Sequence, residues 1–251
     1  MLIQPLMEKL DALRLYGLRA ALAEQLANAQ YAELSFEERL GLLLDAEHTT
    51  RQNASFQRRL KAARLHQPAS LPDLDLSSGR GLDRAQILSL ASGDWISHHL
   101  GVIILGPTGA GKTYLACALG HAACSHDYTV RYERLGRLLL ATALAHADGT
   151  YMRLLDQLRR ADLLILDDWL RDPLTVAQTR DVADILDDRY GRRATLVAAQ
   201  VPVEEWHTRL ADPTLADAIL DRLIHNAFRL QLKGESQRKT RASLAMSISP
   251  S

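Results

Sequence analysis

Residues 106–113 read Gly106-Pro107-Thr108-Gly109-Ala110-Gly111-Lys112-Thr113 and fit the pattern G-x-x-x-x-G-K-[ST] of a phosphate-binding loop. That pattern requires a strand before it and a helix after it. The sequence supplies both, because the apolar run 102–105 precedes the loop and a helical pattern over residues 112–126 follows it. A plain glycine-rich turn is the alternative interpretation, and this context disfavours it. The sequence therefore predicts an α/β fold that binds a nucleoside triphosphate.

The chemistry of such a loop assigns a role to each of its parts. The glycines let the backbone curl so that several N–H groups point at the phosphates, next to the positive end of a helix. Lys112 is expected to reach the β- and γ-phosphates of ATP, and the Thr113 hydroxyl is expected to bind Mg²⁺. We therefore predict that residues 106–113 bind ATP and that Thr113 also belongs to a metal site.

Strands and helices alternate from about residue 82 onward. Short apolar or β-branched runs are separated by segments with helical periodicity, which indicates a parallel sheet covered by helices on both faces. The predicted strands are residues 102–105, 129–132, 163–166, 195–199 and 228–232, and the predicted helices are residues 112–126, 134–147, 151–160, 176–190 and 215–226.

Two carboxylates, Asp167 and Asp168, end the apolar run 163–166. A buried parallel strand delivers functional groups at its carboxyl end, where the ligands of such sheets bind. Asp167 is predicted to hold Mg²⁺ through water, and Asp168 is predicted to orient and polarise the attacking water as a general base. A cap of the strand end or a second metal ligand is the alternative interpretation of Asp168.

Gln200 and Arg222 are the other candidate catalytic residues. Gln200 follows the apolar run 195–199 and is expected to sense the γ-phosphate or to hold the water, although a plain turn amide fits the pattern as well. Arg222 lies near the end of a predicted helix. It either inserts into the site of a neighbouring subunit and stabilises transition-state charge, or pairs locally with Asp217, Asp221 or another carboxylate.

The amino-terminal part of the chain contains helical patterns and no strand pattern. Ser35 and Glu38 form a predicted capping box at the start of one of these helices. We predict a helical DNA- or partner-binding domain over residues 1–66, a linker over 67–81, an ATPase domain over 82–233 and a basic tail over 234–251.

The composition excludes several classes of protein. The 251 residues include 30 Lys and Arg against 30 Asp and Glu, so the net charge is zero and any contact with nucleic acid has to come from local patches. Two cysteines cannot form a disulfide framework and suit a reducing compartment. The longest apolar stretches fall short of the ~20 residues of a membrane span, and no secretory segment is recognisable. We predict a soluble, cytoplasmic protein.

Clusters of basic residues are candidates for contact with DNA phosphates. The alternative is a solvated helix face that complements the helix dipole. One cluster precedes the predicted linker and two flank the strands around residues 129–132 and 163–166. Their members are Arg51, Arg58, Arg59, Lys61 and Arg64, then Arg131, Arg134 and Arg137, and then Arg153, Arg159 and Arg160.

Cys117, His121 and Cys124 share one helix face and suggest a metal site. No fourth ligand is apparent, and the helix that follows a phosphate-binding loop normally packs against the sheet. We therefore interpret these residues as small buried core residues.

Several stretches resemble the IstB-like insertion-sequence ATP-binding proteins, and the resemblance covers nearly the whole chain. They are the phosphate-binding loop, residues 163–168, residues 211–227 (ADPTLADAILDRLIHNA) and residues 232–239 (LKGESQRK). The sequence is more distantly similar to the helicase loader DnaC and the initiator DnaA. Those proteins are AAA+ ATPases, which place an extra strand between the phosphate-loop strand and the Asp-Asp strand.

The resemblance implies a P-loop AAA+ three-layer domain with a five-stranded parallel sheet. It also implies a Mg²⁺-dependent ATPase that assembles on double-stranded DNA as a homo-oligomer, a ring or a helical filament, and that recruits and stimulates the transposase of the same element. Gln200 matches the first sensor position and Arg222 the arginine finger. Because the short tail has no room for a helical lid, Arg238 is a candidate substitute for the lid arginine.

Three other functions compete with this one. A DnaC-like replicative helicase loader would use the same ATP site with a different partner. A small-molecule P-loop kinase belongs to a different class, and the paired carboxylates, the helical amino-terminal region and the lack of an obvious arginine-rich lid argue against it. A nucleotide-gated scaffold would bind ATP with negligible hydrolysis.

Overall fold

The structure is a computed structural model that describes residues 3–76 and 81–233. The chain divides into two compact units, Met1–Arg58 and Arg59–Ser251, so the division falls before residue 66, where the sequence places the end of the helical domain. The predicted tail, including Arg238, lies outside the described residues. Among the helices of the described ranges, none is long and apolar enough to cross a membrane.

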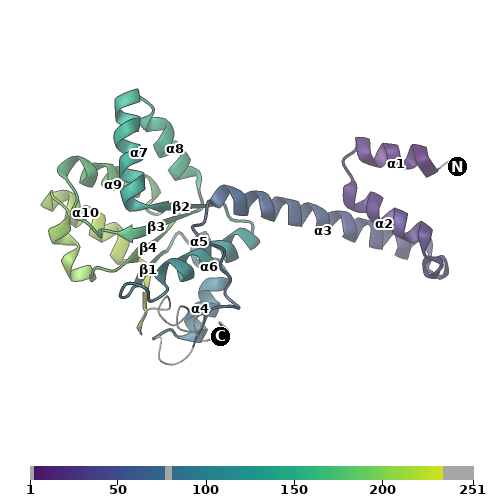
Figure 1. The fold of residues 1–251 in the computed structure, drawn as a ribbon, viewed down its shortest axis with the longest axis horizontal. Helices are drawn as coiled ribbons and strands as arrows, with labels where there is room; N and C mark the ends of the chain where they lie inside the picture. The colour runs from purple at the N-terminus through teal and green to yellow at the C-terminus, as the bar shows by residue number, and fades with distance from the viewer. Residues whose placement is uncertain (1–2, 77–80, 234–251) are drawn as a thin grey trace, which may run out of the picture. The chain divides into compact units, whose positions relative to one another are not determined.

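Five parallel strands form the sheet of the second unit, in the order β2-β3-β4-β1-β5 (Figure 1). The predicted five-stranded parallel sheet is thereby confirmed. β4 lies between the strand that leads into the phosphate-binding loop and the strand that carries the paired carboxylates, as the AAA+ resemblance implies. The strands are β1 (Gly101–Leu105), β2 (Val130–Arg134), β3 (Leu163–Trp169), β4 (Ala194–Ala199) and β5 (Ala227–Gln231).

Helices cover both faces of this sheet, which makes the predicted three layers (Figure 1). Leu164 and Leu166 of β3 belong to the core on the face of α7, α8, α9 and α10. Ile165 points to the other face, where its Cδ1 atom lies only 2.8 Å from the place that a Cβ on Gly120 of α6 would take. The helices are α4 (Arg84–Ala91), α5 (Asp94–Ser97), α6 (Lys112–Ser125), α7 (Leu135–Asp148), α8 (Tyr151–Arg160), α9 (Val176–Arg189) and α10 (Pro213–Ile224).

Local signals fix where the helices near the site begin. α9 starts with a capping box between Thr175 and Gln178. α10 starts at Pro213, two residues before the predicted start, because Asp212 accepts a hydrogen bond from the Leu215 N–H and proline is favoured in the first turn. Two short 3₁₀ turns, Val203–Glu205 and His207–Arg209, lead into α10.

The first unit contains α1 (Ile3–Ala12), α2 (Tyr16–Ala27), the 3₁₀ turn η1 (Ala29–Glu33) and most of α3 (Phe36–Ala63). The predicted capping box of α3 is present, because Ser35 N–H donates to Glu38 over 2.8 Å and Glu38 N–H donates to the Ser35 hydroxyl over 3.2 Å. Leu10 is the only buried apolar residue among the described residues of this unit. Its core is therefore thin.

Residues 67–76, which the sequence suggests as a linker or an extended crossing segment, pack against the second unit. Ala69 is buried, and the Tyr114 hydroxyl of α6 donates to the Ser70 carbonyl oxygen over 3.3 Å. An extended segment without apolar periodicity gives no sequence signal that separates a packed chain from a free linker. This segment forms one wall of the site described below.

Candidate nucleotide-binding site

The phosphate-binding loop connects β1 to α6, as the sequence predicts. Gly109 and Gly111 have φ angles of +81° and +98°, in the left-handed region that favours glycine. Gly111 is the residue that precedes the first turn of α6, so the loop brings its backbone N–H groups to the positive end of that helix. The local conformation thus suits an anion.

Lys112 is folded back over this loop. Its side chain is buried, and Nζ donates to the carbonyl oxygens of Gly106 and Pro107 over 2.8 and 2.9 Å. Burial lowers the pKa of Lys112, although the nearby carboxylates of Asp167 and Asp168 act in the opposite direction. The ammonium group is therefore held by neutral acceptors at the mouth of the loop.

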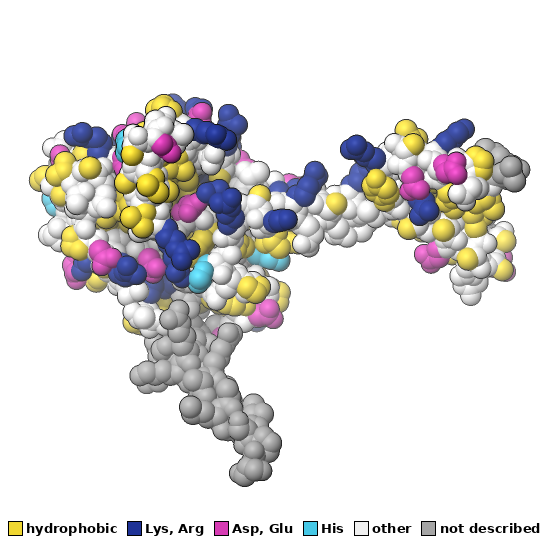
Figure 2. All heavy atoms as spheres, turned by 45° about the horizontal axis from the view of Figure 1, so that its top comes forward, with side chains coloured by type: hydrophobic (Ala, Val, Ile, Leu, Met, Phe, Trp, Pro, Cys, Tyr) yellow, Lys and Arg dark blue, Asp and Glu magenta, His cyan; other side chains and the backbone are white. Residues whose placement is uncertain are grey.

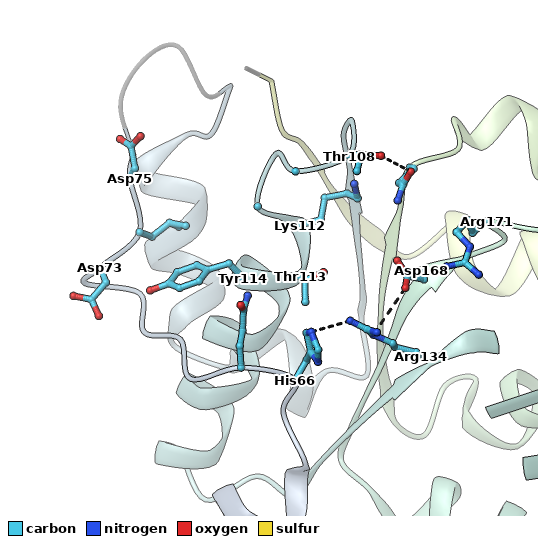
Figure 3. A pocket seen from close by; sticks show the side chains of 15 residues that line it. His66, Asp73, Asp75, Thr108, Lys112, Thr113, Tyr114, Arg134, Asp168 and Arg171 are labelled. Carbon is cyan, nitrogen blue, oxygen red and sulfur yellow. Dashed lines mark hydrogen bonds and ion pairs between the residues drawn. The ribbon is translucent and has the colours of Figure 1, made fainter. Parts of the chain in front are cut away.

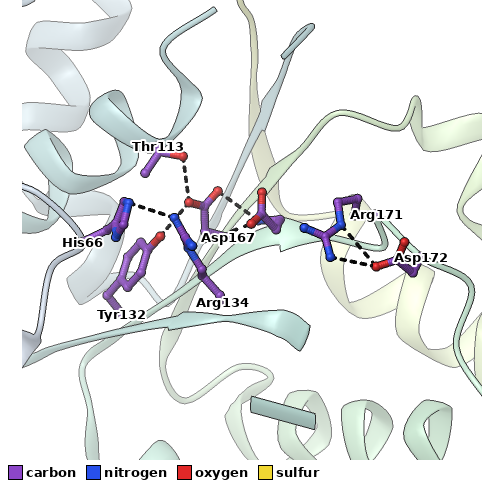
Figure 4. Close-up of polar contacts among 8 residues, drawn as sticks. His66, Thr113, Tyr132, Arg134, Asp167, Arg171 and Asp172 are labelled. Carbon is purple, nitrogen blue, oxygen red and sulfur yellow. Dashed lines mark hydrogen bonds and ion pairs between the residues drawn. The ribbon is translucent and has the colours of Figure 1, made fainter. Parts of the chain in front are cut away.

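Asp167 lies at the end of β3 and is only 1% exposed. Its Oδ2 atom accepts hydrogen bonds from the Thr113 hydroxyl over 2.8 Å and from the Tyr132 hydroxyl over 2.6 Å, and its Oδ1 atom accepts from the Asp168 N–H over 2.9 Å (Figure 4). Burial, followed by contact with Asp167, raises the pKa of Tyr132. The two predicted metal-site residues, Thr113 and Asp167, are therefore in direct contact.

Asp168 faces the cavity beside the loop and has a φ angle of +56°, which is rare for a residue with a side chain. Its carboxylate lies 3.9 Å from Nε of Arg134, the last residue of β2. Arg134 in turn donates to Nε2 of His66 over 2.8 Å. Arg171, which pairs with Asp172, also lines this cavity (Figure 4). Two arginines therefore lie near the half-buried Asp168 carboxylate.

The cavity has a volume of about 360 Å³ and is enclosed by segments that are far apart in the sequence (Figure 3). The phosphate-binding loop and α6 form one side, and Asp168, Arg171 and Gln200 lie near the carboxyl ends of β3 and β4. The segment after α3 forms the remaining wall and contributes His66, Gln67, Asp73, Leu74 and Asp75. A pocket of this size suits a small-molecule ligand.

Gln200 follows β4 and contacts the phosphate-binding loop. Its Oε1 atom accepts a hydrogen bond from the Thr108 hydroxyl over 2.7 Å, and its side chain lines the cavity. The inserted strand β4 therefore places this amide beside the loop. Its role in catalysis stays a prediction.

Arg222 of α10 does not line the cavity. Its guanidinium group donates to the Asp187 carboxylate of α9, and its side chain is 25% exposed. The local partner is thus another carboxylate, rather than Asp217 or Asp221. A role as an arginine finger would require a second subunit and stays a prediction.

Sequence reasoning missed several residues of the site. Arg134 was grouped with the candidate DNA contacts, whereas it lines the cavity, and Tyr132 and His66 received no role. The register between β2 and β3 brings Arg134 and Tyr132 to the site, because Arg134 pairs with Asp167 and Tyr132 with Ile165, and the sequence alone does not contain that register. No sequence pattern indicates that residues 66–75 contribute to the wall of the cavity.

Some of the remaining candidate DNA contacts form ion pairs within the protein, and others do not. Arg59 has partners within the second unit, because it donates to the Cys124 carbonyl oxygen and pairs with Asp127. Arg51 pairs with Glu47, Arg131 with Glu133 and Arg159 with Asp156. Figure 2 shows the basic side chains in separate groups. The exposed candidates outside these ion pairs are Arg58, Lys61, Arg64, Arg137, Arg153 and Arg160.

Cys117 and Cys124 are fully buried in α6. Burial raises the pKa of Cys124 to about 11, which disfavours the thiolate that binds metals. The described ranges contain no cluster of three or more His, Cys, Asp or Glu residues that could hold a metal ion.

Comparisons with known proteins agree with this geometry. The family model of the IstB-like ATP binding protein matches residues 8–245. An insertion sequence ATP-binding protein of Sinorhizobium fredii (strain NBRC 101917 / NGR234) is 47% identical over 239 residues, which cover 95% of this chain and 98% of the relative.

Solved AAA+ structures share the fold. AMPPCP-bound DnaA from Aquifex aeolicus has a TM-score of 0.59 at 17% identity and covers 73% of this chain and 56% of its own. The DnaC helicase loader has a TM-score of 0.53 at 18% identity and covers 70% of this chain and 99% of its own. At these identities the likeness concerns the fold alone.

Proposed function

The chain belongs to the family of IstB-like ATP-binding proteins, and on that premise we propose that it is an ATPase that assists DNA transposition. In this proposal the protein assembles on double-stranded DNA as a homo-oligomer, and ATP binding and hydrolysis let it recruit and stimulate the transposase of its element. The observation that carries the proposal is the meeting of the loop 106–113, Asp168 and Gln200 around one cavity. Relatives matched over nearly the whole chain are insertion-sequence proteins, which favours transposition over helicase loading.

The loop and Lys112 would bind the phosphates of ATP. The Nζ atom of Lys112 contacts two neutral carbonyl oxygens at the mouth of the loop. Phosphate oxygens carry charge and form stronger hydrogen bonds with an ammonium group than carbonyl oxygens do. We therefore expect Lys112 to exchange these acceptors for the β- and γ-phosphates when ATP binds.

Thr113 and Asp167 fit a magnesium site. A hydroxyl and a carboxylate are the hard oxygen ligands that Mg²⁺ prefers, and the two side chains are 2.8 Å apart next to the loop. Thr113 lines the cavity and would bind the ion directly, whereas the buried Asp167 would hold it through water. When bound, Mg²⁺ would neutralise charge on the transferred phosphoryl group.

Asp168 and Gln200 would act on the attacking water. Asp168 presents its carboxylate to the cavity and would accept the hydrogen bond that orients and polarises this water. Gln200 uses its oxygen to hold Thr108, so that its NH₂ group is the part that would donate to the γ-phosphate or the water.

Arg222 would complete the site of a neighbouring subunit. Its partner Asp187 has a side chain that is 66% exposed, and an ion pair in such a position contributes little stability. The arginine can therefore leave Asp187 for the phosphates of a nucleotide bound to the next subunit. In this way hydrolysis would depend on assembly.

Contact with DNA would come from the exposed arginines and lysine on separate parts of the surface. Each subunit offers only a few such contacts, so several subunits would be needed for firm binding. The recruited partner would be the transposase, and the helical first unit is our candidate for either of these contacts.

ATPase assays with the wild-type protein and Asp168→Asn test this function. We expect hydrolysis by the wild-type protein to respond to duplex DNA, and we expect Asp168→Asn to bind ATP but to hydrolyse it about 10²–10⁴-fold more slowly. Transfer of phosphate to a small acceptor would instead identify a kinase. Binding without turnover in the wild-type protein would identify a scaffold, and both results would reject the proposal.

A further inference from the structure

Tyr132 has no part in the functions described so far, yet its hydroxyl reaches the centre of the site. The side chain is 6% exposed and donates a hydrogen bond to Oδ2 of Asp167 over 2.6 Å (Figure 4). We propose that Tyr132 is a positioning residue that holds the Asp167 carboxylate in the orientation required for the magnesium site. This inference rests on the proposed function, in which Asp167 and Thr113 hold Mg²⁺.

The three donors to Asp167 are not equivalent. The Asp168 backbone N–H fixes Oδ1, whereas Oδ2 accepts from the hydroxyls of both Thr113 and Tyr132. The Thr113 oxygen is itself a proposed metal ligand, and its hydroxyl can keep donating to Asp167 while a lone pair of the oxygen binds the ion. Tyr132 does not line the cavity, so its hydroxyl would act on the metal site through the Asp167 carboxylate and not as a ligand.

The surroundings of Tyr132 hold its ring in one place. The residue lies in β2 and pairs with Ile165 of β3, two residues before Asp167 in the adjacent strand. The imidazole ring of His66 stacks on the phenol, with the ring centres 6.1 Å apart and an angle of 13° between the planes. Backbone pairing and stacking together point the hydroxyl at the carboxylate.

A purely structural role would not require the hydroxyl. Phenylalanine would fill the same space between β2, His66 and the core, and it would keep the stacked ring. The phenol oxygen interacts with the Asp167 carboxylate and with the Arg134 guanidinium, both of which belong to the site. Groups that orient metal-binding residues in this way change metal affinity by about 10–100-fold when they are removed.

The matched variants are Tyr132→Phe and Tyr151→Phe. Tyr151 of α8 also donates to a carboxylate, Asp184 of α9, over 3.2 Å, and neither residue lines the cavity. The measurement is the binding of a fluorescent ATP analogue, first in EDTA and then as a function of Mg²⁺ concentration. Asp167→Asn serves as the test of the metal site itself.

We expect Tyr132→Phe to need about tenfold more Mg²⁺ for half-maximal enhancement of binding, with an unchanged affinity in EDTA. Tyr151→Phe should have the same Mg²⁺ midpoint and the same affinity in EDTA as the wild-type protein. A wild-type Mg²⁺ midpoint in Tyr132→Phe, together with a shifted one in Asp167→Asn, would overturn the role of Tyr132 alone. An equal loss of affinity with and without Mg²⁺ would show that Tyr132 supports the pocket as a whole and would also overturn it. If neither Tyr132→Phe nor Asp167→Asn shifts the Mg²⁺ midpoint, the proposed metal role of Asp167 is wrong, and the role of Tyr132 that rests on it is overturned as well.

Discussion

Lys112 shows how one residue can be stable in the fold and still available to a ligand. Its ammonium group is buried, and burial lowers its pKa because the charged form loses contact with water. Two carbonyl oxygens satisfy part of its hydrogen-bonding capacity, since an ammonium group has three donors. A buried ammonium group with an unused donor therefore gains more free energy from hydrogen bonds to phosphate oxygens than an exposed lysine, which water already solvates.

We therefore expect Lys112→Ala to lower the affinity for ATP by about tenfold or more, because a hydrogen bond that involves a charge contributes ~1.5–3 kcal/mol. Titration calorimetry with ATP and Mg²⁺ measures the change. Lys61→Ala, which removes an exposed lysine near the end of α3, is the control and should leave the affinity unchanged. An unaltered affinity in Lys112→Ala would refute the assignment of the phosphate-binding loop.

At the scale of elements, a carboxylate of α3 caps the start of α2. Glu47 is buried, and its Oε2 atom accepts hydrogen bonds from the backbone N–H groups of Gly17 and Leu18 over 2.8 and 3.1 Å. Gly17 permits this approach, because a Cβ there would lie 2.4 Å from the Thr50 hydroxyl oxygen and 2.6 Å from the Ala46 carbonyl oxygen. The contact joins two helices of a unit that has a thin apolar core.

This contact predicts an acid-sensitive step in the first unit. The hydrogen bond from Arg51, with smaller contributions from the Leu18 and Gly17 N–H groups, lowers the pKa of Glu47 below its ordinary value of 4.5. The ionised carboxylate therefore stabilises the fold above pH 4.5, and this contribution is lost as the pH falls through the lowered pKa. NMR titration should show the Gly17 and Leu18 amide signals shifting at that lowered pKa. Glu47→Gln should abolish the step, and its persistence there would contradict the assignment.

Residues at the end of β2 show what the sequence can and cannot predict. Apolar runs and helical periodicity locate all five strands to within a few residues, since a buried strand needs such a run. The predicted second strand ends at residue 132, and the predicted helix begins at Arg134. In the structure Glu133 and Arg134 continue the strand, because they pair with Leu166 and Asp167 of β3. The pairing between β2 and β3 decides where β2 ends, and a single sequence does not show which strands pair or in which register.

The same limit applies to the site. The loop and the paired carboxylates are contiguous in the sequence, so their roles can be predicted from local patterns. The contacts of His66 and Tyr132 join segments more than 30 residues apart and follow only from the sheet order and from the path of the chain after α3. Local patterns thus point to the residues proposed to perform the chemistry, and the tertiary fold adds those proposed to hold them in position.

At the scale of the whole molecule, the position of Arg222 outside the cavity makes hydrolysis a property of the assembly in our proposal. Arg222→Ala should bind ATP with normal affinity and fail to hydrolyse it. Mixing it with Lys112→Ala should restore part of the activity, because one subunit of a mixed interface supplies the intact loop and the other the intact arginine. Steady-state ATPase measurements at several mixing ratios test this. A mixture no more active than its components would mean that Arg222 only pairs with Asp187.

Binding to DNA should depend on assembly in the same way. The chain has no net charge, and on the face that Figure 2 shows its basic side chains lie in separate groups, so we expect one subunit to neutralise only a few phosphates. In our proposal, assembly in the presence of ATP would multiply these contacts and convert nucleotide binding into affinity for DNA through avidity. We expect a non-hydrolysable ATP analogue to strengthen duplex binding with little dependence on base sequence.

A salt titration of this binding provides the quantitative test. Each neutralised phosphate adds ~0.9 to the slope of log affinity against log salt on B-form DNA, so the slope should be steeper in the assembled state. Neutralising Arg58 and Lys61 together, or Arg137 and Arg153 together, should lower the slope if that group contacts phosphates. Arg59→Gln is no substitute for these variants, because Arg59 contacts the end of α6 through the Cys124 carbonyl oxygen and the residues after it through Asp127. Equal affinity and slope with and without nucleotide would rule out ATP-gated assembly as the route to DNA.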